Sequence, residues 1–218
     1  MKLVIFDLDG TLLDTLPDLT DSVNYAMNKL GLPCYTDKQV AAMVGSGMTV
    51  TLTRALGERN IDKLSQARTF QSEYYAAHCN DKTKPFDGVM NLLSRLHNDG
   101  LEIAVYSNKD QAFVEATCKK QFGTLVDYVV GTKPDGAIKP DVTELMKLVD
   151  IVRPKCCVYC GDSDVDVQTA RNANMPCVSV TWGYRNKQQL VAAGATVFVD
   201  DCLAAYECIK KLFVSAER

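Results

Sequence analysis

The chain has 218 residues, of which 47% are hydrophobic and 23% are charged, and its formal net charge is −3. These values suit a protein with a hydrophobic core and give no reason to expect a nucleic acid or an anionic membrane as a partner. No apolar run approaches the ~20 residues that a membrane span needs, and the first residues do not resemble a signal peptide. We therefore expect a cytoplasmic protein, either a monomer or a homodimer.

The first predicted element is a short buried strand at the amino terminus. Residues 3–6 are four consecutive apolar residues, two of them β-branched, which is typical of a strand. Two acidic residues follow directly, in the sequence Asp7-Leu8-Asp9-Gly10-Thr11. In open parallel α/β sheets, ligands bind at the carboxyl ends of the strands. We therefore expect a functional site at this end of the strand.

Residues 14–83 predict helices and no strand. Apolar residues recur at three- and four-residue steps from Leu16 to Leu30, as on one face of an amphipathic helix. A capping box begins a second helix at Thr36, and Gly45-Ser46-Gly47 interrupts the helical pattern after it. We interpret this stretch as a helical insertion behind the first strand. Its helices are expected over residues 16–30, 36–44, 50–56 and 60–78.

After a linker over residues 82–85, strands and helices alternate along the chain. This alternation predicts a parallel sheet with helices on both faces, because parallel neighbours need right-handed crossovers. We therefore expect an α/β fold with a Rossmann-like parallel core of residues 1–13 and 84–218 and an inserted helical-bundle domain of residues 14–83. The strands are expected over residues 3–6, 101–106, 128–130, 156–160, 177–180 and 196–199.

Three of the predicted strands end in polar residues, which a parallel sheet brings to one edge. Clustered carboxylates repel one another and need a compensating cation, and Mg²⁺ suits hard oxygen ligands of this kind. A lysine from the loop after the strand 128–130 is expected at the same edge. Lys139 is favoured over Lys133 because it directly precedes the helix that leads to the strand of Asp162. The polar residues at the strand ends are Asp7, Asp9, Ser107 and Asp162.

The residues at these strand ends resemble the four motifs of the haloacid dehalogenase-like hydrolases. The motifs occur in the order of the family and span the whole predicted core, and residues 14–83 resemble the small helical cap of that family. The four matching segments are Asp7-Leu8-Asp9-Gly10-Thr11, Ser107-Asn108, Lys139-Pro140 and Gly161-Asp162-Ser163-x-x-Asp166.

The resemblance implies a role for each motif. Asp7 would be the nucleophile that forms an aspartyl-phosphate, and Asp9 would act first as general acid and then as general base. Asp7, the main-chain carbonyl of Asp9, and Asp162 would hold Mg²⁺. Lys139 would neutralise developing charge and orient Asp7.

The remaining motif residues have implied roles and simpler alternatives. Thr11, Ser107 and Asn108 would bind the phosphate, although Ser107 alone is also a plausible helix cap. Asp166 and Ser163 would support the water shell of the metal. The alternative is that Asp166 only interacts with the helix dipole and that Ser163 is only a cap.

Within the superfamily, the chain most resembles the phosphoglycolate phosphatases. The resemblance implies a Mg²⁺-dependent hydrolase of a small-molecule phosphate ester, with 2-phosphoglycolate as the expected substrate. The alternatives are a sugar-phosphate phosphatase or phosphomutase, a pyrophosphatase, and a non-catalytic protein that binds a phosphorylated metabolite. The matching segments are Asp14-Thr15-x-Pro17-Asp18-Leu19, Val44-Gly45-Ser46-Gly47, Arg54-Ala55-Leu56-Gly57, Ser107-Asn108-Lys109 and Thr181-Trp182-Gly183-Tyr184.

The choice of substrate is expected to depend on the helical insertion. Gly45-Ser46-Gly47 is the candidate for a loop that reaches the substrate, because its glycines permit close approach and its amides can bind a carboxylate. The alternative is an ordinary helix-breaking turn. Arg54 is a candidate partner for a substrate carboxylate, with a solvated helix face as the alternative. Asp18 and Asp21 are interpreted as solvated or capping residues.

The nine cysteines predict reduced thiols, because their number is odd and no secretion signal is evident. Cys157 and Cys160 match the Cys-x-x-Cys pattern of redox and zinc sites. They lie within a predicted strand, however, where residues three apart point to opposite faces. We therefore interpret them as structural residues.

Overall fold

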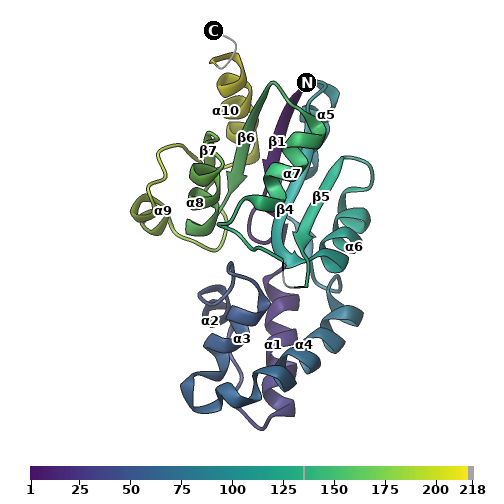
Figure 1. The fold of residues 1–218 in the computed structure, drawn as a ribbon, viewed down its shortest axis with the longest axis vertical. Helices are drawn as coiled ribbons and strands as arrows, with labels where there is room; N and C mark the ends of the chain where they lie inside the picture. Colours follow the sequence, from purple (N-terminus) through teal and green to yellow (C-terminus); the bar gives the residue numbers. More distant parts are fainter. Residues whose placement is uncertain (135, 216–218) are drawn as a thin grey trace.

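The computed structural model describes residues 1–134 and 136–215. Position 135 and residues 216–218, which the predicted core includes, lie outside the described residues. Among the described residues, six parallel strands form one sheet in the order β5-β4-β1-β6-β7-β8 (Figure 1). The predicted parallel α/β fold is thereby confirmed. The strands are β1 (Lys2–Phe6), β4 (Glu102–Asp110), β5 (Tyr128–Thr132), β6 (Cys156–Gly161), β7 (Cys177–Val180) and β8 (Phe198–Val199).

The first strand, β1, lies in the middle of the sheet and is buried on both faces. Leu3 and Ile5 pack into the hydrophobic cluster of one face, whereas Val4 and Phe6 pack into that of the other. This alternation follows from the two-residue period of a strand. Phe6 pairs with residues of both neighbouring strands, β4 and β6. The residues that follow these strands therefore meet at one edge of the sheet.

Helices cover both faces of the sheet. One face packs against α5 (Val89–Asn98), α6 (Gln111–Phe122) and α10 (Cys202–Ser215). The other face packs against α7 (Thr143–Val152) and α8 (Asp164–Asn172), and α9 (Lys187–Ala193) lies against α8. Residues that alternate along the central strands thus reach two separate apolar layers, which explains why the strand reads as a continuous hydrophobic run.

A helical region with a hydrophobic cluster of its own lies beyond the carboxyl edge of the sheet (Figure 1). The start of its last helix differs from the prediction, because a 3-10 helix, η1, occupies Glu58–Lys63, where a single helix from residue 60 was expected. Asn60 has non-helical dihedral angles, which explains the break. The region contains α1 (Leu16–Lys29), α2 (Asp37–Ala41), α3 (Met48–Leu56), η1 and α4 (Leu64–His78).

A short antiparallel ribbon, absent from the sequence-based prediction, joins the two places where the chain crosses between the sheet and the helical region. It consists of β2 (Leu13–Asp14) and β3 (Lys84–Pro85). Next to it, the carboxylate of Asp18 in α1 accepts hydrogen bonds from the amides of Lys82 and Thr83 and from the Thr83 hydroxyl, at 2.7–3.1 Å. Asp18 is only 2% exposed, so its interpretation as a solvated or capping residue was wrong. Asp18 therefore connects residues 82–83, at the second crossing, to α1.

The cysteines carry no disulfide bond, since all nine are free. Cys160 is buried and Cys157 is half-buried within β6. In the part of the chain that the structure describes, none of the helices has both the length and the apolar character needed to cross a membrane.

Candidate active site

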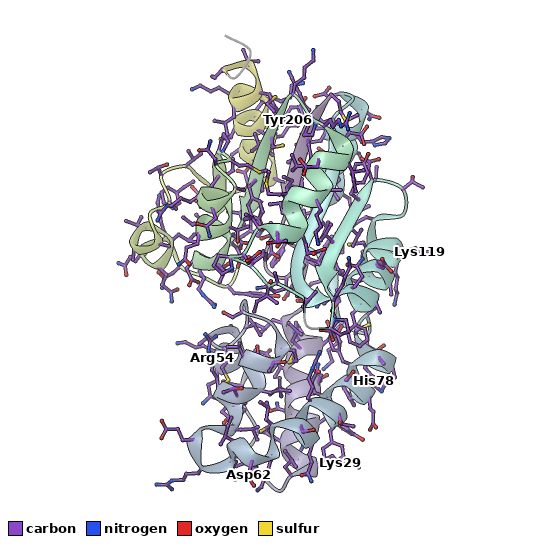
Figure 2. The ribbon with its side chains drawn as sticks, viewed as in Figure 1. Lys29, Arg54, Asp62, His78, Lys119 and Tyr206 are labelled. Carbon is purple, nitrogen blue, oxygen red and sulfur yellow. The ribbon has the colours of Figure 1, made fainter. Side chains whose placement is uncertain are left out.

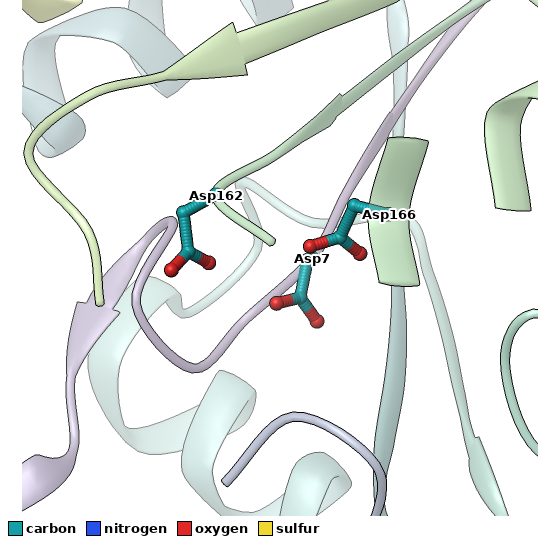
Figure 3. A group of neighbouring side chains, drawn as sticks. All are labelled: Asp7, Asp162 and Asp166. Carbon is teal, nitrogen blue, oxygen red and sulfur yellow. The ribbon is translucent and has the colours of Figure 1, made fainter. Parts of the chain in front are cut away.

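Three buried carboxylates meet at the carboxyl edge of the sheet. Asp7 follows β1, Asp162 follows β6, and Asp166 lies in the first turn of α8. One oxygen atom of each lies within 4.8 Å of an oxygen atom of the others. Figure 3 shows the three carboxylates converging from these separate segments. The expected meeting of Asp7 and Asp162 is therefore present, and the repulsion within this group of acids is relieved by a cation or by a bound proton.

A lysine is inserted into this acidic group. The Nζ atom of Lys139 lies 2.7 Å from Asp7 Oδ1 and 2.8 Å from Asp166 Oδ1. Lys139 is 3% exposed, and the peptide bond to the following proline is cis. Lys133, the alternative considered from sequence, points instead to Glu144 at 3.3 Å on the exposed surface. The structure therefore brings Lys139, and not Lys133, to the acids.

Asp166 has its hydrogen-bonding capacity filled by other side chains of the protein. Its Oδ1 accepts from Lys139 and from the hydroxyl of Tyr159 at 3.0 Å. Its Oδ2 accepts from the amide and hydroxyl of Ser163, at 3.1 and 2.6 Å, in the capping box that begins α8. The carboxylate of Asp166 therefore takes part both in the cap of α8 and in the ion pair with Lys139. Asp166 is better placed to orient Lys139 than to bind a ligand directly.

Asp162 is held from three sides. Its Oδ1 accepts from the hydroxyl of Thr11 at 2.9 Å, and its Oδ2 accepts from the amide of Tyr184 at 2.8 Å. A Cβ atom at Gly10 or at Gly183 would lie within 2.5 Å of an Asp162 atom, so only glycine fits at these positions. Thr11, which the sequence suggested as a phosphate ligand, has its buried hydroxyl on Asp162 instead. It positions this carboxylate.

The buried charges influence one another strongly. Burial, together with the neighbouring Asp166, raises the pKa of Asp7 well above its usual range and that of Asp162 to about 7, although Lys139 opposes the shift at Asp7. Burial alone would lower the pKa of Lys139, but Asp166 and Asp7 raise it overall. The lysine therefore stays charged, and the acids gain stability from any further cation at this place.

Asp9 belongs to a second charged group beside the first. Its Oδ1 accepts from the hydroxyl of Thr15 at 2.7 Å and lies 2.9 Å from Nζ of Lys109. Lys109 is buried and also donates to the hydroxyl of Tyr75, a residue of α4, at 2.8 Å. Burial alone would lower the pKa of Lys109, but Asp9 and Tyr75 raise it overall. A side chain of the sheet is thereby connected to the helical region.

Lys109 was not identified from the sequence as a site residue. Its position in Ser107-Asn108-Lys109, directly behind an apolar strand, is the signal that was available. The observed strand β4 continues through these residues to Asp110, beyond the predicted end at residue 106. The pairing with β5 shifts register between Tyr106 and Asp110, so the strict alternation of a regular strand does not apply to these residues.

A pocket of ≈ 570 Å³, including its open mouth, separates the edge of the sheet from the helical region. Asp7, Asp9 and Ser107 line it from the sheet. Gly45 and Gly47 line it from the loop between α2 and α3. The predicted catalytic acids and the glycines of the predicted substrate loop therefore face a common space.

Hydrogen bonds to main-chain atoms keep the loop between α2 and α3 close to the sheet. The side-chain amide of Asn108 donates to the carbonyl of Gly45 at 3.0 Å, and its oxygen accepts from the amide of Lys139 at 2.7 Å. Arg185 donates to the carbonyls of Ala41 and Val44 at 2.7 and 2.6 Å. Asn108, predicted as a phosphate ligand, thus has its side chain engaged in joining two loops.

Two of the predicted substrate residues lie elsewhere. Ser46 and Arg54 line a separate groove, together with Asp164 and Arg185. The guanidinium of Arg54 donates to the carbonyl of Met43 at 2.6 Å, and Figure 2 shows this side chain at the outer side of the helical region. The expected meeting of Arg54 with a substrate near Asp7 is not supported, because the helix that carries Arg54 turns it away from that pocket.

Comparison with known proteins gives matches over nearly the whole chain. A sequence model of the haloacid dehalogenase-like hydrolases matches residues 4–180. The chain is 32% identical over 213 residues to a phosphoglycolate phosphatase of Pseudomonas putida. This match covers 93% of this chain and 78% of that protein. It is also 32% identical over 212 residues to a phosphoglycolate phosphatase of Aliivibrio fischeri, covering 92% of this chain and 93% of that protein.

Solved structures give the same result. A crystal structure from Lactobacillus delbrueckii subsp. bulgaricus, of a protein assigned as a phosphoglycolate phosphatase, superposes with a TM-score of 0.91 at 34% identity and covers 95% of this chain and 97% of that chain. A corresponding structure from Haemophilus somnus superposes with a TM-score of 0.85 at 25% identity, covering 97% of this chain and 98% of that chain. The similarity extends over the sheet and the helical region together.

Proposed function

We propose that this chain, which belongs to the haloacid dehalogenase-like hydrolases, is a phosphatase whose substrate is a small phosphate monoester, 2-phosphoglycolate before any other. The observation that carries the proposal is the position of Asp7. Its carboxylate lies between a buried lysine and the pocket, within reach of Asp162. The names of the similar bacterial proteins support the substrate.

In the proposed reaction Asp7 is the nucleophile. Lys139 holds its Oδ1, whereas its Oδ2 has no hydrogen-bond partner among residues 1–134 and 136–215 and remains available on the pocket side. Attack of this oxygen on phosphorus forms an Asp7–phosphate bond while the bond to the leaving alkoxide breaks. Asp9 gives a proton to the alkoxide and then takes one from the water that hydrolyses the intermediate.

The acidic group fits Mg²⁺. This ion is usually bound by one or two protein carboxylates, with water and phosphate oxygens completing its shell, and Asp7 and Asp162 provide two buried carboxylates close together. We propose that these carboxylates and the main-chain carbonyl of Asp9 hold the ion. When bound, Mg²⁺ supplies the positive charge that lets an anionic nucleophile approach an anionic phosphate. Ser107, on the pocket wall, donates a hydrogen bond to a phosphoryl oxygen.

We further propose that residues 14–83 form a cap domain over a core of residues 1–13 and 84–218. The ribbon of β2 and β3 connects the two parts, and the remaining hydrogen bonds between them include those from Asn108 and Arg185. Movement about the ribbon would admit the substrate, and closure would exclude water from the phosphorylated intermediate.

A phosphate-release screen of the purified protein tests the proposed function. We expect hydrolysis of 2-phosphoglycolate with Mg²⁺, no hydrolysis with EDTA, and recovery when Mg²⁺ is restored. A response only to sugar phosphates would contradict the substrate but not the phosphatase activity. A protein that releases phosphate from no monoester, with the metal present, would contradict the proposed function itself.

A further inference from the structure

The helical region contributes one wall of the pocket, and the guanidinium of Arg68 forms part of that wall. Arg68 of α4 and Asp7 face the same pocket. The Nη1 atom of Arg68 donates to Oε1 of Gln71 at 2.8 Å, and Gln71 is 1% exposed and donates to the hydroxyl of Ser22 in α1 at 3.2 Å. Two helices therefore fix the direction of the guanidinium.

A carboxylate of the core already binds this guanidinium. The Nη2 atom of Arg68 forms an ion pair with Oδ2 of Asp110, the last residue of β4. Both side chains are partly exposed, at 29% and 37%, and both line the pocket. Since the planar fork of an arginine has five donors, a second carboxylate can bind it beside Asp110 or in its place.

The cationic side chains that line the pocket are Arg68 and Lys109. Leu19, Val44, Met48 and Phe113 are apolar parts of the lining. The buried ammonium of Lys109 is occupied by Asp9 and Tyr75. For an ester whose phosphate lies at Asp7 and whose other end is a carboxylate, Arg68 is therefore the cationic partner in the lining that is still partly exposed, and a carboxylate buried without a partner against apolar side chains is unfavourable.

We propose that Arg68 recognises the carboxylate of the substrate and so selects phosphate esters of small hydroxy acids. The proposal rests on the proposed function and replaces the role considered for Arg54. Asp110 occupies the guanidinium in the free protein and gives way when the substrate binds.

The test compares two esters that differ in one group. Ethyl phosphate carries a methyl group where 2-phosphoglycolate carries its carboxylate. In Arg68→Met, we expect kcat/KM for 2-phosphoglycolate to fall by about 10- to 100-fold, as for a lost hydrogen bond to a charged group, while kcat/KM for ethyl phosphate stays nearly constant. Arg68→Lys keeps the charge but loses the fork, and is expected to lie between the wild type and Arg68→Met.

Two further variants complete the design. Arg59→Met, in η1, is the matched control, because this helix lies at the end of the helical region far from the sheet, where Figure 2 labels Asp62. It is expected to leave both esters unaffected. Asp110→Asn is expected to maintain or raise kcat/KM for 2-phosphoglycolate, since it removes the competing carboxylate. Circular dichroism and thermal unfolding verify that each variant is folded.

The outcomes distinguish a failure of the assignment of Arg68 from a failure of the proposed function. An equal loss for both esters in Arg68→Met and in Asp110→Asn would identify the ion pair as a closing contact only and would overturn the proposal. So would an unchanged preference for 2-phosphoglycolate over ethyl phosphate in Arg68→Met. A wild-type protein that hydrolyses neither ester contradicts the proposed function, and with it this assignment.

Discussion

The edge of the sheet and the helical region form opposite walls of one pocket, but they hold their polar groups in different ways. At the sheet, Lys139 and Asp166 are nearly inaccessible and are joined to several partners each. On the helical side, Arg68 is partly exposed and its carboxylate partner comes from the sheet. A site that must hold charges for a reaction needs the first arrangement, whereas a site that must exchange substrates needs the second.

The largest expected effect comes from the wall formed by the sheet. Asp7→Asn removes the proposed nucleophile while nearly preserving its shape, and kcat is expected to fall by about 10⁴-fold or more. Asp62→Asn, an exposed change in η1, is the control and should have no effect. The measurement is phosphate release under saturating Mg²⁺. Undiminished activity of a folded Asp7→Asn variant would refute the assignment of the nucleophile.

Lys139→Met tests whether the sheet wall depends on its buried charge. It leaves Asp7 and Asp166 without their ion-pair partner, and losing one member of a buried pair costs about 3–5 kcal/mol. The free energy of unfolding in urea should fall by this amount, and activity should fall with it. Lys133→Met, on the exposed surface, is the matched control and should change neither. Equal effects of the two changes would show that the buried lysine has no special role.

Asp18→Ala tests the connection between the two regions. It removes the carboxylate that accepts four hydrogen bonds from Lys82 and Thr83 at the second chain crossing. The free energy of unfolding is expected to fall by about 1–3 kcal/mol. Asp21→Ala is the control, because Asp21 forms an exposed ion pair with Lys82. If both variants unfold at the same urea concentration, the crossing is not fastened through Asp18.

The pH dependence of stability tests the electrostatics of the acids. Because the folded pKa of Asp162 is raised to about 7, the folded protein holds a proton that the unfolded chain releases near pH 4. The metal-free protein should therefore lose stability as pH rises through 5–7, by roughly 1 kcal/mol per pH unit or about 2–4 °C in Tm. Mg²⁺ should restore Tm most strongly at the upper end of this range.

The Asp162→Asn variant provides the control for the pH experiment. Its metal-free Tm should vary less with pH between 5 and 7, and Mg²⁺ should raise it less, because one of the two proposed carboxylate ligands is lost. A wild-type Tm that rises over this range without metal would have the wrong sign for an acid whose pKa is raised by burial.

The two walls also differ in how far the sequence predicts them. Asp7 and Asp162 could be placed together from sequence because a parallel sheet aligns the ends of its strands. Lys139 could be ranked above Lys133 by its position along the chain. Thr11 could not be assigned to Asp162, because that contact depends on two loops that the sheet brings together.

The helical wall depends on packing that no local pattern reveals. Arg54 and Arg68 lie on two different helices, and the packing of α3 and α4 decides which of them lines the pocket of Asp7. The burial of Asp18 likewise depends on Lys82 and Thr83, which lie 64 and 65 residues further along the chain. The interpretation of Asp18 was wrong because those distant residues form its environment.

Transfer of the phosphoryl group to Asp7 tests the central claim most directly. Wild-type protein with Mg²⁺ is mixed with 2-phosphoglycolate labelled with ³²P, quenched in acid within milliseconds, and digested for mass spectrometry. We predict label on the amino-terminal peptide at Asp7, and none in Asp7→Asn. Rapid hydrolysis with label on another residue, or with no protein-bound label at any time during turnover, would contradict the account.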